Sequence, residues 1–388
     1  MNLPVTEFNA NQSLIYLIIN KISGGDLIMP LSEIKLRNHF NISRNVISSL
    51  RVLRKLDNYH WAISLSKDYL VVIIAIYLSV GISFWFYPLS LLMIGSTQRA
   101  FTNILHYSSH HVLAKNKFLN YIAGTFLSGH LVFHLLSTYK DPHVRYHHAH
   151  LGDPEKDPDY KFHIDSGLYD FNQNDREFFI QNILLTLSGY RTFKYIKYVI
   201  EDIIKSRKNK ELKKDENKVT KKKSGNKNDK ESTFFFIYWI VILSIIIYSG
   251  YFLYFILLWI VPLFTVTVAI GWIIGIAEHY PLPASEKEAL LLTRNTKGIW
   301  WERFLFGRHY DNYHLVHHLY PGIPHWNIKK AHIYLLNDPN YQKWDDLWGG
   351  IFIREYPHQE TMLSYASKYR KFKKENEEGS FAKRLLSI

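Results

Sequence analysis

The longest uncharged stretch of the chain restricts its fold more than any other feature of the sequence. From Phe234 to Ala277 the chain holds 44 residues without a single Asp, Glu, Lys or Arg. As an α-helix this stretch would be about 66 Å long, twice the thickness of the hydrocarbon core of a bilayer. Ser249 and Gly250 interrupt it near the middle. The stretch therefore predicts two transmembrane helices joined by a tight turn.

A second uncharged run covers the 30 residues from Tyr69 to Gln98 and is interrupted by Tyr87-Pro88. One tilted helix nearly fits this length. A hairpin whose second helix continues past Arg99 fits it as well. We expect the hairpin, and hence an all-α, multi-pass membrane protein with two transmembrane helical hairpins.

The basic segment from Lys205 to Ser232 orients these hairpins. It holds 12 Lys or Arg against 5 Asp or Glu, a net charge of +7 within the chain's +13. Such a segment repels itself and buries nothing, which predicts a disordered linker. It directly precedes the long apolar stretch, so the positive-inside rule places it in the cytoplasm. The high pI of 9.4 then reflects membrane topology, and we expect no nucleic-acid partner.

The first 66 residues form a separate N-terminal leader in the cytoplasm. Within it, residues 36–53 read as two short helices around a turn at residues 41–43, weakly similar to the helix-turn-helix of winged-helix regulators. No wing strands follow before the membrane begins, which favours an amphipathic leader. Residues 67–335 form the membrane domain, including the 205–232 linker, and residues 336–388 form a cytoplasmic tail.

Histidine is unusually abundant among the side chains that can bind a metal. The chain has 20 histidines and no cysteine, which excludes thiolate metal sites, iron–sulfur clusters and disulfides. They gather at the ends of the apolar segments, in HYSSHH, HVRYHH and HLVHH, with a further one in EHY. The candidate ligands are His106, His110, His143, His147, His148, His279, His314, His317 and His318.

Nine imidazoles are too many for one zinc ion, which takes three or four protein ligands, and suit two ions of higher coordination. Imidazole binds iron, copper, nickel and zinc alike, so the ligand type leaves the metal open. A non-enzymatic metal carrier would need ligands along a path inside the bilayer. These histidines instead lie at segment ends, which favours a metalloenzyme.

The combination of motifs resembles the membrane fatty acid desaturase and hydroxylase superfamily, which is marked by three histidine boxes and an outlying histidine. HYSSH is similar to the first box, HVRYHH followed by LGDPEKDPDY to the second, and NYHLVHHLYPGIPHWN to the third, with EHY at the outlying position. The resemblance covers roughly residues 70–335. It implies two iron ions held by the nine histidines in a cytoplasmic cap, and attack on an unactivated C–H bond with O2 and two electrons.

The sequence departs from the family at two positions. Many members carry an acidic residue after the first histidine of the first box and another inside the third, where this chain has Tyr107 and Val316. These departures leave the outcome of C–H attack open. Some further histidines match no box, and we expect them either to be structural or to support the metal ligands from behind: His130, His134, His150 and His163.

Carboxylates beside metal-bound imidazoles commonly fix their tautomer and orientation. The candidates for this role are Asp153, Asp157, Asp159, Glu278 and Asn312, the last with an amide in place of a carboxylate. All nine histidines must also lie on one face of the membrane. The apolar segment 118–139 between the first two boxes is therefore expected to be a re-entrant or interfacial helix instead of a span.

The expected reaction is O2-dependent desaturation of an acyl chain of a fatty acid or lipid. The alternative is hydroxylation or ketolation of a lipid, carotenoid or alkane at the same centre. No haem-binding HPGG-like segment occurs, so the resemblance implies an external electron donor, either ferredoxin or cytochrome b5 with a reductase. Residues 341–388 are the expected docking region. The expected location is the bacterial inner membrane, with the active site facing the cytoplasm.

Overall fold

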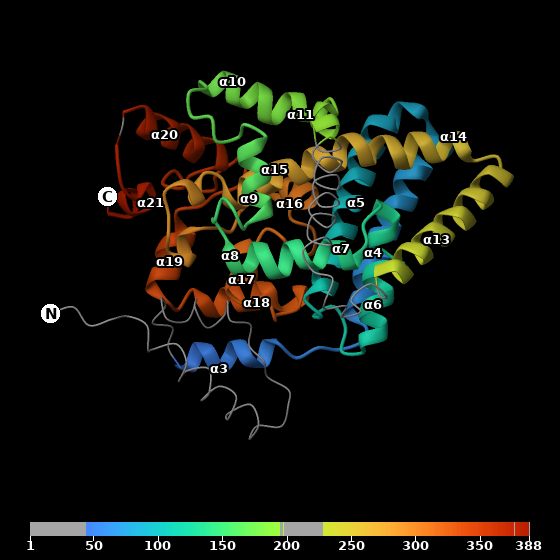
Figure 1. Cartoon of the computed structure of the whole chain (residues 1–388), viewed down its shortest axis with the longest axis horizontal. Helices are drawn as coiled ribbons and strands as arrows, with labels where there is room; N and C mark the ends of the chain where they lie inside the picture. The colour runs from blue at the N-terminus through green and yellow to red at the C-terminus, as the bar shows by residue number, and fades with distance from the viewer. Residues whose placement is uncertain (1–43, 195–196, 198–227, 376, 388) are drawn as a thin grey trace, which may run out of the picture. The chain divides into compact units, whose positions relative to one another are not determined.

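The computed structural model describes residues 44–194, 197, 228–375 and 377–387. Within these ranges the regular elements are all helices and no β-strand forms, which confirms the predicted all-α class (Figure 1). The α-helices are α3 Arg44–Leu53, α4 His60–Ile76, α5 Tyr87–Ser109, α6 Lys117–Thr125, α7 Leu136–Lys140, α8 His148–His150, α9 Pro158–Asp165, α10 Asp175–Phe179, α11 Leu185–Leu187, α13 Asn228–Tyr248, α14 Phe252–Phe255, α15 Val268–His279, α16 Trp300–Phe306, α17 His314–Leu319, α18 His325–Leu335, α19 Pro339–Asp346, α20 Met362–Lys374 and α21 Phe381–Ser387.

Short 3-10 and π-helical segments connect or extend these helices. The 3-10 helices are η2 Phe84–Phe86, η3 Gly129–Val132, η8 Leu282–Ala284, η9 Ala289–Leu291 and η10 Arg308–Tyr310. The π-helical segments are η1 Tyr77–Ile82, η4 Asp141–His147, η5 Ile180–Leu184, η6 Ile256–Ile260 and η7 Leu263–Thr267.

Three helical segments in the described part of the chain are long and apolar enough to cross a membrane, or up to four if one bent pair counts as a span. They are His60–Ile82, Lys230–Tyr248 and Phe252–His279. The last two are the limbs expected from the 44-residue stretch. They meet at Gly250, whose φ of 77° is one that glycine adopts without the steric penalty of a side chain.

The other uncharged run also folds back on itself. The Ser83 hydroxyl accepts a hydrogen bond from the Trp85 backbone N–H at the turn, and α5 then returns alongside α4. Pro88 lies in the first turn of α5, where its missing N–H costs no helical hydrogen bond. Although α5 is 23 residues long, it is not among the three candidate spans. It is enclosed by other helices, so it retains buried polar residues that a lipid-facing helix would exclude.

Small residues let α5 approach its neighbours closely. A methyl group at Gly95 would lie 2.4 Å from a carbon of the Val266 side chain, on η7. A methyl group at Gly124, on α6, would lie 2.2 Å from the Ser108 side chain of α5. Glycine at these two positions therefore sets the spacing of helices around the first histidine box.

The segment between the first two boxes is a bent pair of helical stretches. Lys117–Val132 and Leu136–His150 meet at an angle of 93°. At the bend, Phe133 adopts a left-handed φ of 60°, and the Glu231 carboxylate accepts hydrogen bonds from the backbone N–H groups of Leu136 and Ser137. These contacts satisfy two of the N–H groups that the start of α7 leaves unpaired. Such a bend fits either a broken span or a re-entrant segment, so the expected re-entrant helix stays a prediction.

The chain beyond α15 covers the end of that helix. Ile351, Met362 and Ala366 share a buried core with Trp272, Ile276 and Tyr280. Residues 336–388 therefore pack into the same compact unit as the membrane helices, which extends over Ile42–Ile388.

Helix ends differ from several boundaries expected from the sequence. The first span begins at His60, inside the region assigned to the leader, and α13 begins at Asn228, four residues before the end of the expected linker. Of the helix-turn-helix-like segment at residues 36–53, the structure describes only α3. Residues 36–43 of this segment and residues 205–227 of the linker lie outside the described residues.

Candidate metal centre

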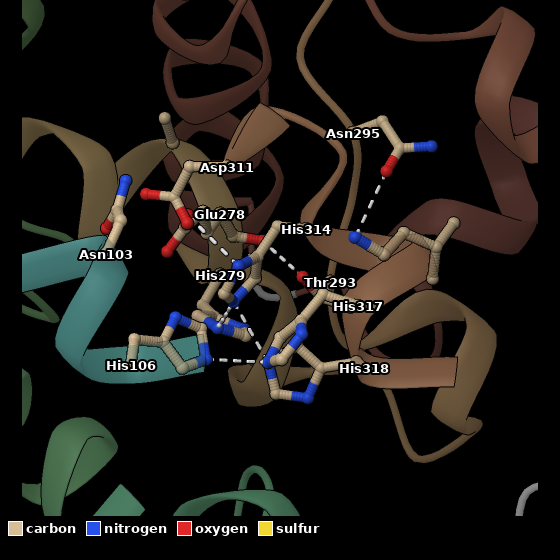
Figure 2. A network of polar contacts seen from close by, with 12 residues as sticks. Asn103, His106, Glu278, His279, Thr293, Asn295, Asp311, His314, His317 and His318 are labelled. Carbon is tan, nitrogen blue, oxygen red and sulfur yellow. Dashed lines mark hydrogen bonds and ion pairs between the residues drawn. The ribbon is translucent and has the colours of Figure 1, made fainter. Parts of the chain in front are cut away.

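All nine candidate histidines converge in the structure, and they divide into two groups. The ligand nitrogens of each group lie within 4.8 Å of one another. The larger, the five-histidine group, consists of His106, His110, His143, His148 and His317, and the four-histidine group consists of His147, His279, His314 and His318. Figure 2 shows His106 of α5 facing the imidazoles that α17 presents.

Four Nε2 atoms of the five-histidine group form a closed ring. Successive distances are 2.9 Å from His106 to His143, 3.1 Å from His143 to His148, 3.0 Å from His148 to His317 and 2.8 Å from His317 to His106. A square with sides of about 3 Å has its centre about 2.1 Å from each corner, the length of an imidazole–metal bond. The spacing therefore fits one metal ion shared by these nitrogens.

Protons alone do not satisfy this ring. A neutral imidazole nitrogen either donates its N–H or accepts through its lone pair, and it cannot do both. Around four nitrogens, at most two donors alternate with two acceptors, so each N–H would be divided between two partners. The Nε2 of His110 is also buried and has no hydrogen-bond partner. A metal ion uses all five lone pairs at once, so the residues present fit such an ion.

The four-histidine group is equally compact. The Nε2 atom of His314 lies 3.0 Å from that of His279 and 2.9 Å from that of His318. The His147 ring centre is 5.0 Å from the ring centres of His279 and His318. This group joins helices that are far apart in the sequence: η4, the end of α15, and α17.

Asp157 orients His147. Its Oδ1 lies 2.9 Å from the His147 Nδ1, which leaves Nε2 free to bind a metal. Burial tends to raise the pKa of Asp157, but His147 and the Gly152 backbone N–H hold that pKa below its ordinary value. The carboxylate is therefore ionised at neutral pH. Asp157 also caps α9 by accepting from the backbone N–H groups of Asp159 and Tyr160.

The two other oriented imidazoles of the four-histidine group lie on α15 and α17. The His279 Nδ1 is 3.1 Å from the Leu292 carbonyl oxygen, and the His314 Nδ1 is 3.1 Å from Glu278 Oε1. Each contact involves Nδ1, and Nε2 is left for the metal. The Leu292 carbonyl can thereby fix the tautomer and the ring direction of His279, whereas the Glu278 contact with His314 has an ion-pair distance without hydrogen-bond geometry.

The remaining candidates for orienting the imidazoles lie farther from them. Asp159 is exposed, with one carboxylate oxygen 3.5 Å from the His147 Nδ1. Asp153 accepts hydrogen bonds from the backbone N–H groups of Glu155 and Lys156 in its own turn. Asn312 donates to the Thr296 carbonyl, and so shapes the chain before α17. The structure thus brings Asp157 and Glu278 directly to the histidines, and Asp159 less closely.

Arg99 and Asp311 belong to the site although the sequence analysis did not single them out. Asp311 forms a compact group with Glu278 and His314 (Figure 2). Its carboxylate lies 3.0 Å from the Arg99 guanidinium. Both are largely buried. A signal was available, because Arg99 is a charge within the apolar course of the first hairpin, where charged residues are costly and commonly functional.

Arg294 fixes the end of the helix that carries His279. Its fully buried guanidinium donates hydrogen bonds to the backbone carbonyls of Ile276, Ala277 and Tyr280. It also lies 4.5 Å from the centre of the Trp348 indole ring. The last carbonyls of a helix lack intrahelical partners, so Arg294 caps α15 where the ligand emerges.

Asn295 fixes α17 in a similar way. Its side-chain oxygen accepts from the Leu315 backbone N–H at 3.1 Å, in the first turn of α17 (Figure 2). Its amide nitrogen donates to the Tyr341 hydroxyl and to Asp345 Oδ1, at 2.8 and 2.7 Å. α19 thereby holds the third histidine box in position.

The three α17 histidines are candidate metal ligands that burial keeps neutral. Burial and neighbouring imidazoles hold the pKa values of His314, His317 and His318 well below the ordinary value. The two residues that depart from the family pattern lie beside them. The Tyr107 ring packs edge-on to the His317 ring, its hydroxyl donates to the His309 carbonyl, and Val316 is buried in the core.

The histidines outside the boxes do not join either group. His130 is buried, has no hydrogen-bond partner for either ring nitrogen, and is surrounded by the rings of Phe126, Phe235 and Tyr238. His163 packs edge-on against Trp272. His134 and His150 are also absent from both groups.

Candidate membrane spans and two clusters of converging histidines that could each hold a metal ion are the features of a membrane metalloprotein. Residues 58–345 match the model of the family described as fatty acid desaturase, and the chain belongs to that family. It is also similar to the dihydrorhizobitoxine desaturase of Bradyrhizobium elkanii, with 36% identity over 322 residues, which cover 83% of this chain and 88% of the relative. The protein is therefore an oxidoreductase of the desaturase type.

Proposed function

We propose that this protein inserts a double bond into an acyl chain of a fatty acid or lipid, using O2 and two iron ions held by the nine histidines. The observation that carries the proposal is the division of these histidines into a group of five and a group of four with converging Nε2 atoms. Each group has enough imidazoles for one ion of the site.

The overall reaction balances as follows. The substrate loses one hydrogen atom from each of two neighbouring carbons, and a double bond forms between them. O2 takes up these two hydrogens, two electrons and two protons, and is reduced to two water molecules. The bound iron would supply the O2 activation and the oxidant for the C–H bond.

The protein's own residues hold and orient the metal ligands. Asp157 and the Leu292 carbonyl hold the Nδ1–H groups of His147 and His279, so that each Nε2 faces the metal position. The side chains of both histidine groups are largely buried, which restricts water around the reacting atoms. Burial also keeps the imidazoles of α17 unprotonated and able to bind metal.

We further propose that the electrons come from a separate ferredoxin, or from cytochrome b5 with its reductase. The family and the missing HPGG-like segment support an external carrier. The active site is proposed to face the cytoplasm of a bacterial inner membrane. The basic segment before α13 supports this orientation through the positive-inside rule.

The test is an assay of purified membranes with each carrier system, NAD(P)H and deuterium-labelled acyl substrates. Products that have lost two hydrogens per molecule support desaturation. Products that have gained one oxygen atom assign the chain to the hydroxylases instead. The relative's name gives dihydrorhizobitoxine as its substrate, so this compound is the second candidate and belongs in the same assay. Turnover of that compound, with none of any acyl donor, would overturn the acyl assignment.

A further inference from the structure

A helical limb beside α15 exposes apolar side chains and buries polar ones. This limb, residues 178–193, comprises the end of α10, η5, α11 and the turn that follows. Its large exposed side chains are Leu184, Leu185, Leu187, Tyr190 and Phe193, and Phe193 is 77% exposed. The side facing the protein carries the polar residues Asn182, Thr186, Arg191 and Thr192 beside the apolar Phe178 and Ile183. This polarity is the reverse of that expected for a helix whose outer face meets water.

The buried polar side chains are satisfied within the limb and by α15. The Arg191 guanidinium donates to the Asn182 side chain and to the Gln181 carbonyl, and its carbon lies 3.5 Å from the centre of the Trp272 ring. The Asn182 and Thr186 side chains donate to backbone carbonyls one turn earlier. The polar side chains of the inner face therefore have partners within the protein, and the large apolar side chains of the outer face have none described.

The contacts of the limb show that it runs antiparallel to the span Phe252–His279. At one end Phe178 stacks on Tyr280, with ring centres 5.5 Å apart. At the other end the Thr192 hydroxyl donates to the Phe264 carbonyl. From Phe178 to Thr192 the limb advances 14 residues, or about 21 Å of helix, and from Phe264 to Tyr280 the span advances 16 residues, or about 24 Å. The two segments therefore cover similar lengths side by side. Figure 1 shows α10 and α11 lying along α15.

The length of the span places this limb relative to the bilayer. The span has 28 residues, or about 42 Å, against about 30 Å of hydrocarbon. Tyr248 and Tyr251 are exposed at its far turn, where an aromatic belt meets the headgroups. About 20 helical residues cross the hydrocarbon core. Counted from Tyr251, they place the cytoplasmic boundary of the hydrocarbon at the level of Gly271. Phe264 then lies about 10 Å below this boundary, and the limb enters the membrane with its second half.

We propose that residues 184–193 are embedded in the cytoplasmic leaflet of a phospholipid bilayer, as an anchor that dips into the membrane alongside the metal-bearing helix. Interfacial helices bury their apolar face about 5–10 Å into this region. Further along, the chain carries the segment 205–232 of net charge +7, which suits anionic headgroups. The lipid-facing surface of the spans is thereby continued along the side of the catalytic region.

The absence of cysteine permits a direct test. Phe193→Cys is spin-labelled in the full chain, reconstituted into bilayers of phosphatidylglycerol and phosphatidylethanolamine, and its relaxation by O2 and by water-soluble chromium oxalate is measured. Val80→Cys, exposed on the first span, is the lipid reference, and Glu155→Cys, in an exposed loop, is the water reference. Retained metal content shows that each variant has folded. Leu187→Cys replaces Phe193→Cys if that variant fails to fold.

The expected result is strong relaxation by O2 and weak relaxation by chromium oxalate, as at Val80. Relaxation dominated by chromium oxalate, as at Glu155, would mean that the limb lies in water and would overturn the proposal. Protection from both reagents would mean that protein, such as a second copy of the chain, covers this face, and would overturn it as well. The measurement involves no turnover, so its outcome is independent of the substrate and of the proposed reaction.

Discussion

The two metal positions depend on which ring nitrogen each histidine presents. Four Nε2 atoms form a ring in one group, and in the other Nδ1 of His147, His279 and His314 contacts a protein oxygen. Rotation of one such ring would turn a ligand nitrogen away from the metal. The side chains that hold the rings therefore matter almost as much as the ligands themselves.

Replacing one ligand in either group is expected to abolish turnover. His147→Ala and His279→Ala remove a quarter of the donors of the four-histidine group, and His317→Ala breaks the four-nitrogen ring. Iron per chain, measured by mass spectrometry, should fall from two towards one, and activity should fall by more than about 100-fold. His358→Ala is the control, because His358 contacts Asp346 at the surface. Activity surviving in two of the three ligand variants would mean that the ligand set is wrong.

Asp157 and Asp153 offer a matched pair four residues apart. Asp157→Asn weakens the charged contact to the His147 Nδ1, so metal affinity or activity should fall by about 10- to 100-fold. The Asp153 carboxylate accepts hydrogen bonds from the backbone of its own turn and does not contact His147. Asp153→Asn should therefore leave metal affinity and activity near the wild-type values. Equal losses in the two variants would argue that loop folding, and not the orientation of His147, explains the effect. Iron titration followed by absorbance distinguishes these results.

At the scale of helices, close packing around α5 sets the position of the first histidine box. Gly124 allows α6 to touch α5 at Ser108, which lies two residues after His106. The Asn120 amide donates to the Ser108 carbonyl at 3.0 Å and reinforces this contact. A displaced α6 would therefore move the turn of α5 that carries His106 and His110.

Gly124→Ala tests this packing against Gly271→Ala. The added methyl group at residue 124 would lie 2.2 Å from the Ser108 side chain, whereas one at residue 271 meets no atom within 4 Å. Overpacking costs about 1–3 kcal/mol, so Gly124→Ala should lower the Tm in detergent. Gly271→Ala should leave it unchanged or raise it slightly, because alanine favours the helix by about 0.5–1 kcal/mol. Equal Tm values would show that α6 moves aside without cost.

At the scale of the whole molecule, the proposed arrangement requires both hairpins to begin and end on the cytoplasmic side. Only then do the ends of α5 and α15, with η4 and α17, meet on one face of the membrane. As a re-entrant segment, the pair Lys117–Val132 and Leu136–His150, bent by 93°, would let the chain pass from the first box to the second without crossing. The limb at residues 184–193 would add a contact with the same leaflet.

Topology reporters test this arrangement. Tags at residue 220 and at the C-terminus should report the cytoplasm, and a tag near Ser249 should report the opposite side. Tags near Lys115 and Lys140 should report the same side as each other. If these two positions fall on opposite sides, the bent pair crosses the membrane and the proposed cytoplasmic meeting of the boxes is wrong.

The sequence by itself determined the all-helical class, the family and the nine histidines that converge. These features depend on local patterns: uncharged runs long enough to span a bilayer, and imidazoles repeated at helical spacing. Spacing along a helix does not identify a partner on another helix. The neighbouring residues His147 and His148 join different groups, as do His317 and His318.

Only the tertiary structure decided those memberships, because each depends on the direction in which an imidazole projects from a packed helix. It also revealed the buried Arg99, Arg294 and Asp311, whose partners lie on distant segments. The reversed polarity of residues 178–193 was hidden for the same reason. Which face of that limb meets protein is settled by its packing against α15, and the apolar face left over then points outward.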